Sequence, residues 1–262
     1  MPRATSPAAS DLPSQIAQRT LAHVVQRPAP HPCLVGARVA LRPQCLGCDG
    51  RPDTGQRLLE RGDVCVMQGD PATHLFAVVE GFLRESTYDA DGRAVAARIV
   101  GPGHVLGLAA LNPTPSSYVA TIEVLSRARV CILPADRARA WFTEHASFAL
   151  DLAVLAAADL DHLRRDLALR AQPADDRVLA LITELVRAST SDPLAWVRLP
   201  ATREQLGEVL GLTLETVSRA VQRLVARGHL ELRGRDLRLI STHDATTGPA
   251  DPGSQPTRSA EP

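Results

Sequence analysis

The segment from Thr202 to Ile240 constrains the fold more than any other part of the chain, because its local signals define two short helices. Thr202 and Gln205, three residues apart, form a capping box that predicts the start of a helix. Gly211 stands where a residue in the left-handed conformation would end that helix. Thr213 then predicts the N-cap of a second helix. The two helices are therefore joined by a tight turn.

A β-hairpin is predicted after the second helix, where Leu230-Glu231-Leu232 and Leu237-Arg238-Leu239 flank Gly234-Arg235. Two helices followed by such a hairpin form a winged helix-turn-helix, whose second helix enters the major groove of DNA. From Thr213 to Arg238 the segment holds six arginines against three acidic residues, an excess of positive charge that favours binding to phosphates. The outer face of the second helix carries polar side chains: Glu215, Ser218, Arg219, Gln222 and Arg223.

Glu215 and Arg219 lie one helical turn apart, and their spacing allows two interpretations. An arginine can donate to O6 and N7 of guanine, and a glutamate can accept from N4 of cytosine. The same spacing is that of an i, i+4 salt bridge on a solvated helix face. The capping box, the turn, the second helix and the hairpin, in that order, favour DNA recognition. Thr213 and Thr216 are included among the predicted DNA contacts.

Composition limits what the rest of the chain does. The 262 residues carry 29 basic and 29 acidic side chains, so any attraction for DNA must come from a local patch. No apolar run approaches the roughly 20 residues of a membrane span, and the N-terminus lacks a signal-peptide core. These features predict a cytoplasmic protein with no membrane partner. Residues 1–32 are expected to form a mobile arm, and residues 243–262 a disordered tail.

Residues 57–134 have the pattern of a small antiparallel β-roll or jelly roll. Asp91-Gly92 is a typical hairpin turn between two such strands. Short apolar runs that predict strands occur at 64–67, 75–79, 94–100, 118–124 and 130–133. We therefore expect an α+β protein with a cysteine-containing segment and β-roll at 33–143, a dimerisation helix at 144–172 and a winged helix-turn-helix domain at 173–242.

A helical pattern begins near Pro134 and ends before Pro173, which breaks the helix. The 4-3 spacing of a two-stranded coiled coil is followed by Ala149, Ala153, Ala156, Leu160, Leu163 and Leu167. A single amphipathic helix on its own domain would give a similar pattern. Because Phe148, Leu152 and Leu155 supply a second apolar face, one face can cover the β-roll while the other meets a second copy. A homodimer is the better interpretation, with an interface at Ala156, Leu160, Leu163 and Leu167.

Two motifs resemble the CRP/FNR family of transcription regulators. Gly211 to Arg219 (GLTLETVSR) resembles the recognition segment of its FNR branch, and Arg61 to Gly81 (RGDVCVMQGDPATHLFAVVEG) is similar to its β-roll. The resemblance implies a sensory β-roll, a dimer helix and a winged helix-turn-helix. It implies that Glu215, Ser218 and Arg219 read bases in a palindrome similar to TTGAT-N4-ATCAA. The expected partners are double-stranded DNA, RNA polymerase and a second copy of the chain, and an enzymatic activity is not expected.

The signal is predicted from the β-roll and the cysteines. Cyclic-AMP-binding relatives use a glutamate and an arginine beside serine or threonine, whereas Gly103 to Tyr118 contains neither an acidic residue nor an arginine. Cyclic AMP is therefore not expected, since its phosphate would lack a cationic partner. FNR-branch sensors hold a [4Fe–4S] cluster with three N-terminal cysteines and one from the β-roll. The resemblance implies a cluster with these ligands: Cys33, Cys45, Cys48 and Cys131.

Other interpretations of the sensor remain open. Cys33 lies further from the C-x-x-C of Cys45 and Cys48 than the family spacing requires, so this pair could bind zinc, form a disulfide or bind nothing. Cys65 falls in an apolar run and is predicted to be a core residue. His74 or His104 could hold haem, although a single histidine on a β-roll is usually only hydrogen-bonded. A sensor domain that only dimerises, a cupin-like metalloenzyme and a thiol oxidoreductase are further alternatives, and the two enzymes leave the winged helix unexplained.

Overall fold

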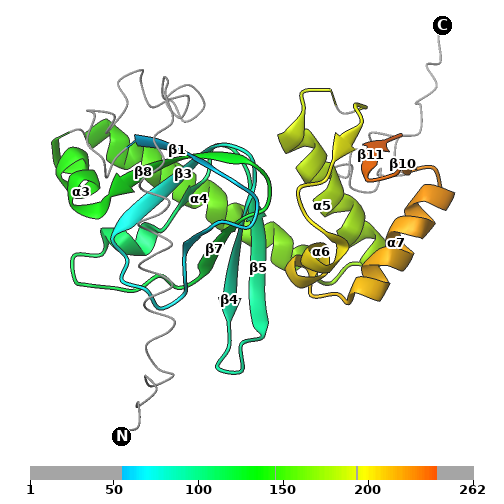
Figure 1. The fold of residues 1–262 in the computed structure, drawn as a ribbon, viewed down its shortest axis with the longest axis horizontal. Helices are drawn as coiled ribbons and strands as arrows, with labels where there is room; N and C mark the ends of the chain where they lie inside the picture. Colours follow the sequence, from blue (N-terminus) through cyan, green and yellow to red (C-terminus); the bar gives the residue numbers. More distant parts are fainter. Residues whose placement is uncertain (1–54, 145, 193, 241–262) are drawn as a thin grey trace, which may run out of the picture.

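The computed structural model describes residues 55–144, 146–192 and 194–240, which form a β-roll, a long helix and a smaller helical domain (Figure 1). The fold is of the α+β class expected. Two four-stranded antiparallel sheets, β1-β8-β3-β6 and β2-β7-β4-β5, make up the roll. Their strands are β1 (Gly55–Leu59), β2 (Val64–Val66), β3 (His74–Glu80), β4 (Leu83–Tyr88), β5 (Ala94–Val100), β6 (Val105–Leu106), β7 (Thr121–Val124) and β8 (Ala128–Pro134).

The observed strands confirm most of the predicted β pattern. β5 occupies the predicted residues 94–100, and Asp91-Gly92 lies in the turn that joins β4 to β5, with Gly92 at φ 75°. The strand predicted at 118–124 begins only at Thr121, because Tyr118 is held elsewhere. The Tyr118 hydroxyl accepts from the backbone N–H of His74 at 2.9 Å and donates to its carbonyl oxygen at 2.8 Å. Side chains from both sheets fill one core.

The helical pattern predicted after Pro134 is divided into two helices, α3 (Ala135–Glu144) and α4 (Ala146–Leu169). α4 therefore starts and ends about two residues inside the predicted dimerisation helix. It runs along the β-roll toward the helical domain (Figure 1). Leu155 packs against Val79 of the roll, as predicted for the second apolar face, and Ala77 and Cys131 contact the same valine. The side chain of Phe148 lies outside the described part of the chain. A short 3-10 helix (Leu108–Leu111) follows β6.

The helical domain contains α5 (Ala174–Ser189), β9 (Val197–Arg198), α6 (Arg203–Leu210), α7 (Leu214–Ala226), β10 (Leu230–Arg233) and β11 (Asp236–Leu239). The predicted capping box is present: the Thr202 hydroxyl accepts from the N–H of Gln205 at 3.2 Å, and the Gln205 side chain accepts from the N–H of Thr202 at 2.9 Å. Gly211 ends α6 at φ 63°, and the Thr213 hydroxyl accepts from the N–H of Thr216. β10 and β11 form the predicted hairpin, extended by β9.

The β-roll and the helical domain share a continuous apolar core. Phe82, Ile99 and Leu125 of the roll lie in the same cluster as the buried residues of α5, α6 and α7. Next to this cluster, Arg84 of β4 contacts Glu208 of α6 and lies 2.6 Å from Glu123 of β7. The orientation of the helical domain is therefore set by direct packing on β4 and β5. Among the described helices, none is both long enough and apolar enough to span a membrane.

Candidate DNA-binding site

α7 presents a polar face to solvent and an apolar face to the domain core. Val217, Val221 and Leu224 are buried, as the sequence predicts. On the opposite face, the side chains of Glu215 and Arg219 are 72% and 67% exposed, and Arg219 Nη2 lies 2.5 Å from Glu215 Oε1. The salt bridge and DNA recognition are thus compatible, because an ion pair so exposed can exchange its partner for a base edge at low cost.

The remaining predicted contacts on α7 have different surroundings. The hydroxyls of Thr213 and Thr216 lie 2.9 Å apart at the start of the helix, so both side chains take part in its N-terminal cap. Ser218 is half-buried, while Gln222 is exposed on the same face as Glu215. The cap thus fixes the first turn of α7 by satisfying the backbone N–H of Thr216.

Arg223 is the predicted contact whose geometry differs most from expectation. Its guanidinium binds Asp175 of α5 through Nε and Nη2, at 2.9 Å and 2.5 Å, and Arg227 Nη1 adds a contact of 3.1 Å to the same carboxylate. Asp175 is buried, and the hydrogen bond and charge of Arg223 hold the pKa of that carboxyl below its ordinary value. Arg223 therefore fastens α7 to α5, a role that the helical pattern did not predict because its partner lies in another helix.

Three exposed arginines near α7 were not among the predicted contacts: Arg203 at the start of α6, and Arg233 and Arg235 in the hairpin. Within the described ranges, no carboxylate lies at ion-pair distance from any of them. Arg203 and Arg235 border a hollow of about 560 Å³, which is also lined by Arg61 and Arg198. Phosphates would be attracted to this cationic surface. The sequence did contain a signal for these phosphate-binding candidates. Arg203 follows the helix cap at Thr202, and Arg233 and Arg235 flank the turn at Gly234.

Two family models match the chain. One describes a cyclic nucleotide-binding domain over residues 56–145, and the other a Crp-like helix-turn-helix domain over residues 176–245. The chain belongs to the CRP/FNR family. It is thus a DNA-binding transcription regulator of that type, and α7 is the second helix of its helix-turn-helix. The family consists of transcription regulators rather than enzymes, which agrees with the class expected from the sequence.

Individual CRP/FNR proteins are similar to this chain over most of its length. The transcriptional activator protein FnrA of Stutzerimonas stutzeri is 26% identical over 71% of this chain and 77% of its own length. The probable transcriptional regulator flp of Lacticaseibacillus casei is 28% identical over 73% of this chain and 85% of its own. The structure of FixK2 from Bradyrhizobium japonicum superposes with a TM-score of 0.62 at 27% identity, covering 72% of this chain and 93% of that one.

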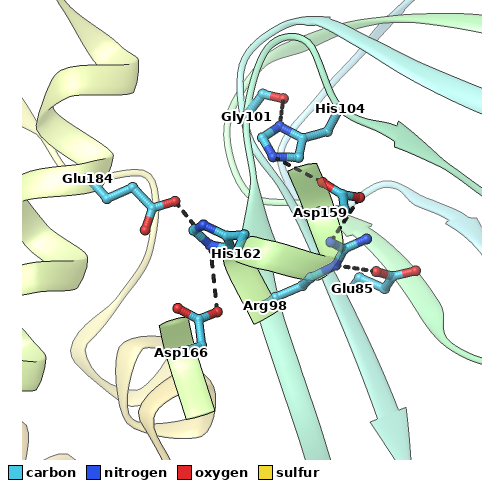
Figure 2. A network of polar contacts seen from close by, with 8 residues as sticks. All are labelled: Glu85, Arg98, Gly101, His104, Asp159, His162, Asp166 and Glu184. Atoms are coloured by element: carbon cyan, nitrogen blue, oxygen red, sulfur yellow. Dashed lines mark hydrogen bonds and ion pairs between the residues drawn. The ribbon is translucent and has the colours of Figure 1, made fainter. Parts of the chain in front are cut away.

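The β-roll of this CRP/FNR protein contains a small pocket of about 130 Å³ beside Gly107 and Tyr118. Glu85 and Arg98 do line this pocket, but they belong to β4 and β5 rather than to the segment from Gly103 to Tyr118. Glu85 and Arg98 lie there only 2.6 Å apart, and Arg98 also contacts Asp159 of α4 (Figure 2). The guanidinium is thus already neutralised by two carboxylates.

The histidines considered as haem ligands both make ordinary contacts. His74 Nδ1 lies 2.9 Å from the hydroxyl of Thr73, and His104 Nδ1 lies 3.0 Å from the carbonyl oxygen of Gly101. His104 Nε2 is 3.7 Å from Asp159. Each imidazole therefore has the polar contacts that the simpler interpretation of these histidines predicts.

The two cysteines that the structure describes have opposite environments. Cys65 is fully buried in the core of the roll, as predicted, and burial together with the charge of Asp63 raises the pKa of its thiol to about 12. Cys131 is half-buried on the outer face of β8, between Gln56 of β1 and Ala77 of β3, where Leu155 of α4 packs. Cys33, Cys45 and Cys48, the other predicted ligands, lie outside the described residues.

The predicted dimer interface lies on α4. Leu160, Leu163 and Leu167 are 48%, 41% and 63% exposed in the single chain, and Ala156 is also exposed. Leu163 and Leu167 in addition border a cavity of about 590 Å³ between α4, α5 and the β4–β5 hairpin. A row of exposed leucines at coiled-coil spacing costs free energy in water, so it is consistent with a helix that pairs.

Proposed function

We propose that this CRP/FNR protein binds, as a homodimer, a palindrome similar to TTGAT-N4-ATCAA and regulates transcription by RNA polymerase in response to oxygen or redox state. The observation that carries the DNA part is the outer face of α7, where Glu215 and Arg219 are exposed and aligned one turn apart. Two such helices in a two-fold dimer match the symmetry of a palindrome.

For the sensor we propose a [4Fe–4S] cluster held by Cys33, Cys45, Cys48 and Cys131. Such a cluster would supply oxygen-labile redox chemistry. Cys131 suits a ligand because its thiol is on the outer face of the roll and only half-buried, whereas the fully buried Cys65, with a pKa of about 12, does not form a thiolate at neutral pH. The contact of Leu155 with the surface around Cys131 would link the state of this thiol to α4.

A cyclic nucleotide is not the proposed signal. The pocket in the roll, about 130 Å³, is smaller than the roughly 300 Å³ or more of small-molecule sites. Among its described lining residues the one guanidinium, that of Arg98, is already paired with Glu85 and Asp159. Binding a phosphate there would break both contacts and leave two carboxylates unpaired beside an anion.

The sensor proposal is tested on protein purified without oxygen after expression with full cluster-assembly support. We expect brown protein with about four iron and four sulfide per chain that bleaches in air. Cys131→Ser and Cys45→Ser should lose the colour and oxygen-dependent DNA binding, and Cys65→Ala is the control that keeps both. Cys33→Ser decides whether the distant cysteine is a ligand, since colour retained in that variant would assign the fourth position to another group.

Two results would contradict the cluster without affecting the DNA-binding assignment. Colourless wild-type protein that contains zinc would indicate a thiolate zinc site at Cys45 and Cys48. Colourless protein without metal would leave thiol chemistry or a sensor domain that only dimerises. In either case the specific binding to the palindrome, measured separately with the same protein, would still test the function of α7.

A further inference from the structure

The first turn of α7 exposes an apolar side chain next to its polar ones. Leu214, the first residue of α7, is 52% exposed. Glu215 follows it directly, and Ser218, four residues further on, lies on the same side of the helix. The surface that carries the predicted base contacts therefore includes an exposed leucine, which was not among the contacts predicted from the sequence.

Leu214 takes no part in the packing of the helix-turn-helix. The apolar residues before and after it differ in this respect, because Val217 is buried in the core of the helical domain and Leu212 packs against it. These two residues occupy the positions of a hydrophobic staple, which fixes the entry of the chain into the helix. Among the described residues, Leu214 belongs to none of the buried apolar clusters. The packing of the domain therefore does not require a leucine at this position.

The start of α7 does not require an apolar residue either. The hydroxyl of Thr213 accepts from the N–H of Thr216, and the charge of Glu215 complements the helix dipole. The first helical position favours proline or an acidic side chain. Leucine at this position contributes to neither the cap nor the dipole, and its exposure to water costs free energy.

Backbone hydrogen bonds hold Leu214 in a fixed place on α7. The N–H of Leu212 donates to the carbonyl oxygen of Gly207 at 2.8 Å, which ties the turn to α6. The N–H of Val217 donates to the carbonyl oxygen of Thr213 at 3.0 Å, which closes the first turn. Leu214 lies between these two contacts, so little backbone freedom is lost when its side chain meets a partner.

The proposed half-site, TTGAT, contains one G·C pair and four A·T pairs, and the exposed charged residues of α7 suit only the first kind. Glu215 can accept from N4 of cytosine, and Arg219 can donate to O6 and N7 of guanine. In the major groove, thymine is distinguished by its 5-methyl group, which apolar side chains contact. Because the N-terminal residues of the second helix contact base edges, Leu214 occupies a position from which such a methyl group can be reached.

We propose that Leu214 determines specificity for thymine by packing against the 5-methyl group of one thymine in each half-site. This role rests on the proposed binding of α7 to the palindrome. The contact removes the leucine and the methyl group from water together, so its contribution is lost when the methyl group is absent. Burial of one methyl group corresponds to about fourfold in affinity for each half-site and about fifteenfold for a two-fold dimer.

Replacement of thymine by uracil tests this contact, because it removes the 5-methyl group and keeps the base pair. Duplexes of the palindrome are substituted at one thymine position at a time, in both half-sites, and fluorescence anisotropy measures their affinities. For wild-type protein we expect about fifteenfold weaker binding at one position and nearly unchanged binding at the others.

Variants of Leu214 assign the effect of the methyl group to this side chain. Leu214→Ala should bind the thymine and uracil palindromes equally, and it should keep the wild-type Tm because the side chain is exposed. Leu214→Met, which keeps an apolar side chain of similar volume, should retain the preference for thymine. Leu232→Ala is the matched control and should show the full loss on uracil, since Leu232 is an exposed leucine of the same domain outside α7.

A scrambled duplex of the same composition separates this role of Leu214 from the proposed function. Wild-type protein that prefers the palindrome over the scrambled duplex, yet binds every uracil duplex as tightly as the thymine one, would overturn the role of Leu214 alone. A loss on uracil that persists in Leu214→Ala would also overturn it, since the methyl group would then contact another residue. Wild-type protein with no preference for the palindrome would overturn both.

Discussion

The arginines of the DNA-binding domain differ mainly in the carboxylates with which they form ion pairs. Arg219 pairs with an exposed glutamate on its own helix. Arg223 is bound by a buried aspartate, and Arg235 forms no ion pair within the described residues. Exposed pairs contribute only about 0–1 kcal/mol and are readily exchanged, whereas a buried carboxylate left unpaired is costly. We therefore expect base reading from Arg219, helix positioning from Arg223 and phosphate binding from Arg235.

Arg219→Ala should weaken binding to the palindrome by about 1–3 kcal/mol and leave binding to random DNA nearly unchanged, because a lost base contact affects only the specific complex. Glu215→Ala should relax the base preference at one position of each half-site. Fluorescence anisotropy at fixed salt measures both affinities. Arg235→Ala is the comparison: it should weaken both complexes and reduce the salt dependence. An equal loss on both DNAs in Arg219→Ala would show that Arg219 contacts phosphate.

The carboxylate that holds Arg223 gives a prediction for stability against pH. The hydrogen bond from Arg223 is the main cause of the lowered pKa of Asp175, so this group contributes stability above the pKa of the unfolded chain. That contribution is lost as the pH falls through the lower, folded-state pKa. Asp175→Asn should lower the Tm by a few degrees at pH 7, and the difference from wild type should shrink below about pH 4.

The control for Asp175 is its neighbour. Asp176 lies in the same first turn of α5 but is exposed, and within the described residues it forms no ion pair. Asp176→Asn should therefore change the Tm much less than Asp175→Asn, because it shares the helix dipole and not the buried arginine contacts. Equal effects of the two variants in thermal melts would attribute the stability to the dipole.

At the scale of elements, the helix-turn-helix depends on a close approach between α6 and the start of α7. Gly207 is buried in α6, and its carbonyl oxygen accepts from the N–H of Leu212 at 2.8 Å. A Cβ atom at this position would lie 2.6 Å from the carbonyl oxygen of Leu212, which is backbone and cannot move aside alone. The two helices can keep their present crossing only with glycine here.

Gly207→Ala should therefore separate α6 from α7. Overpacking of this kind costs about 1–3 kcal/mol, and we expect a lower Tm together with weaker binding to the palindrome. Thermal melts and DNA titrations on the same preparation measure the two effects. A variant that keeps the wild-type Tm and the wild-type affinity would show that the turn has room for a methyl group.

At the scale of the whole molecule, α4 has three sides with different surroundings: the β-roll, the helical domain and solvent. Its inner side carries Leu155 against the roll, and His162 faces the DNA-binding domain. The side with the heptad leucines is exposed in the single chain. A second copy bound along that side would leave the inner contacts intact, so dimerisation and the domain contacts can coexist on one helix.

Leu160→Asp should weaken the dimer and, with it, binding to the palindrome through loss of the second half-site. Because Leu160 is 48% exposed in the single chain, the substitution should leave the fold intact. Leu163→Asp should act in the same way. Sedimentation and DNA titration measure the two effects, with Val154→Asp, exposed but outside the heptad positions, as the control. Monomeric wild-type protein in the presence of its signal would show that the interface assignment is wrong.

The sequence by itself determined those elements whose signals are local. The capping box of Thr202, the turn at Gly211 and the hairpin around Gly234 are all made by hydrogen bonds and φ angles within a few residues. The inner face of α7 follows from helical periodicity, and β5 from an apolar run after the turn at Asp91-Gly92. For the same reason the exposed pair Glu215 and Arg219 could be identified as a surface feature before any fold was known.

Only the tertiary structure decided the features that join distant segments. β4 (LRESTY) lacks the apolar run of a strand, and it forms because β5 and β7 pair with it and α6 covers it through Arg84. The partner of Arg223 lies 48 residues away, and that of His162, Glu184, lies across the turn between two helices. Such contacts depend on how the domains pack, because charge and shape complementarity between remote surfaces leave no periodic trace in the chain.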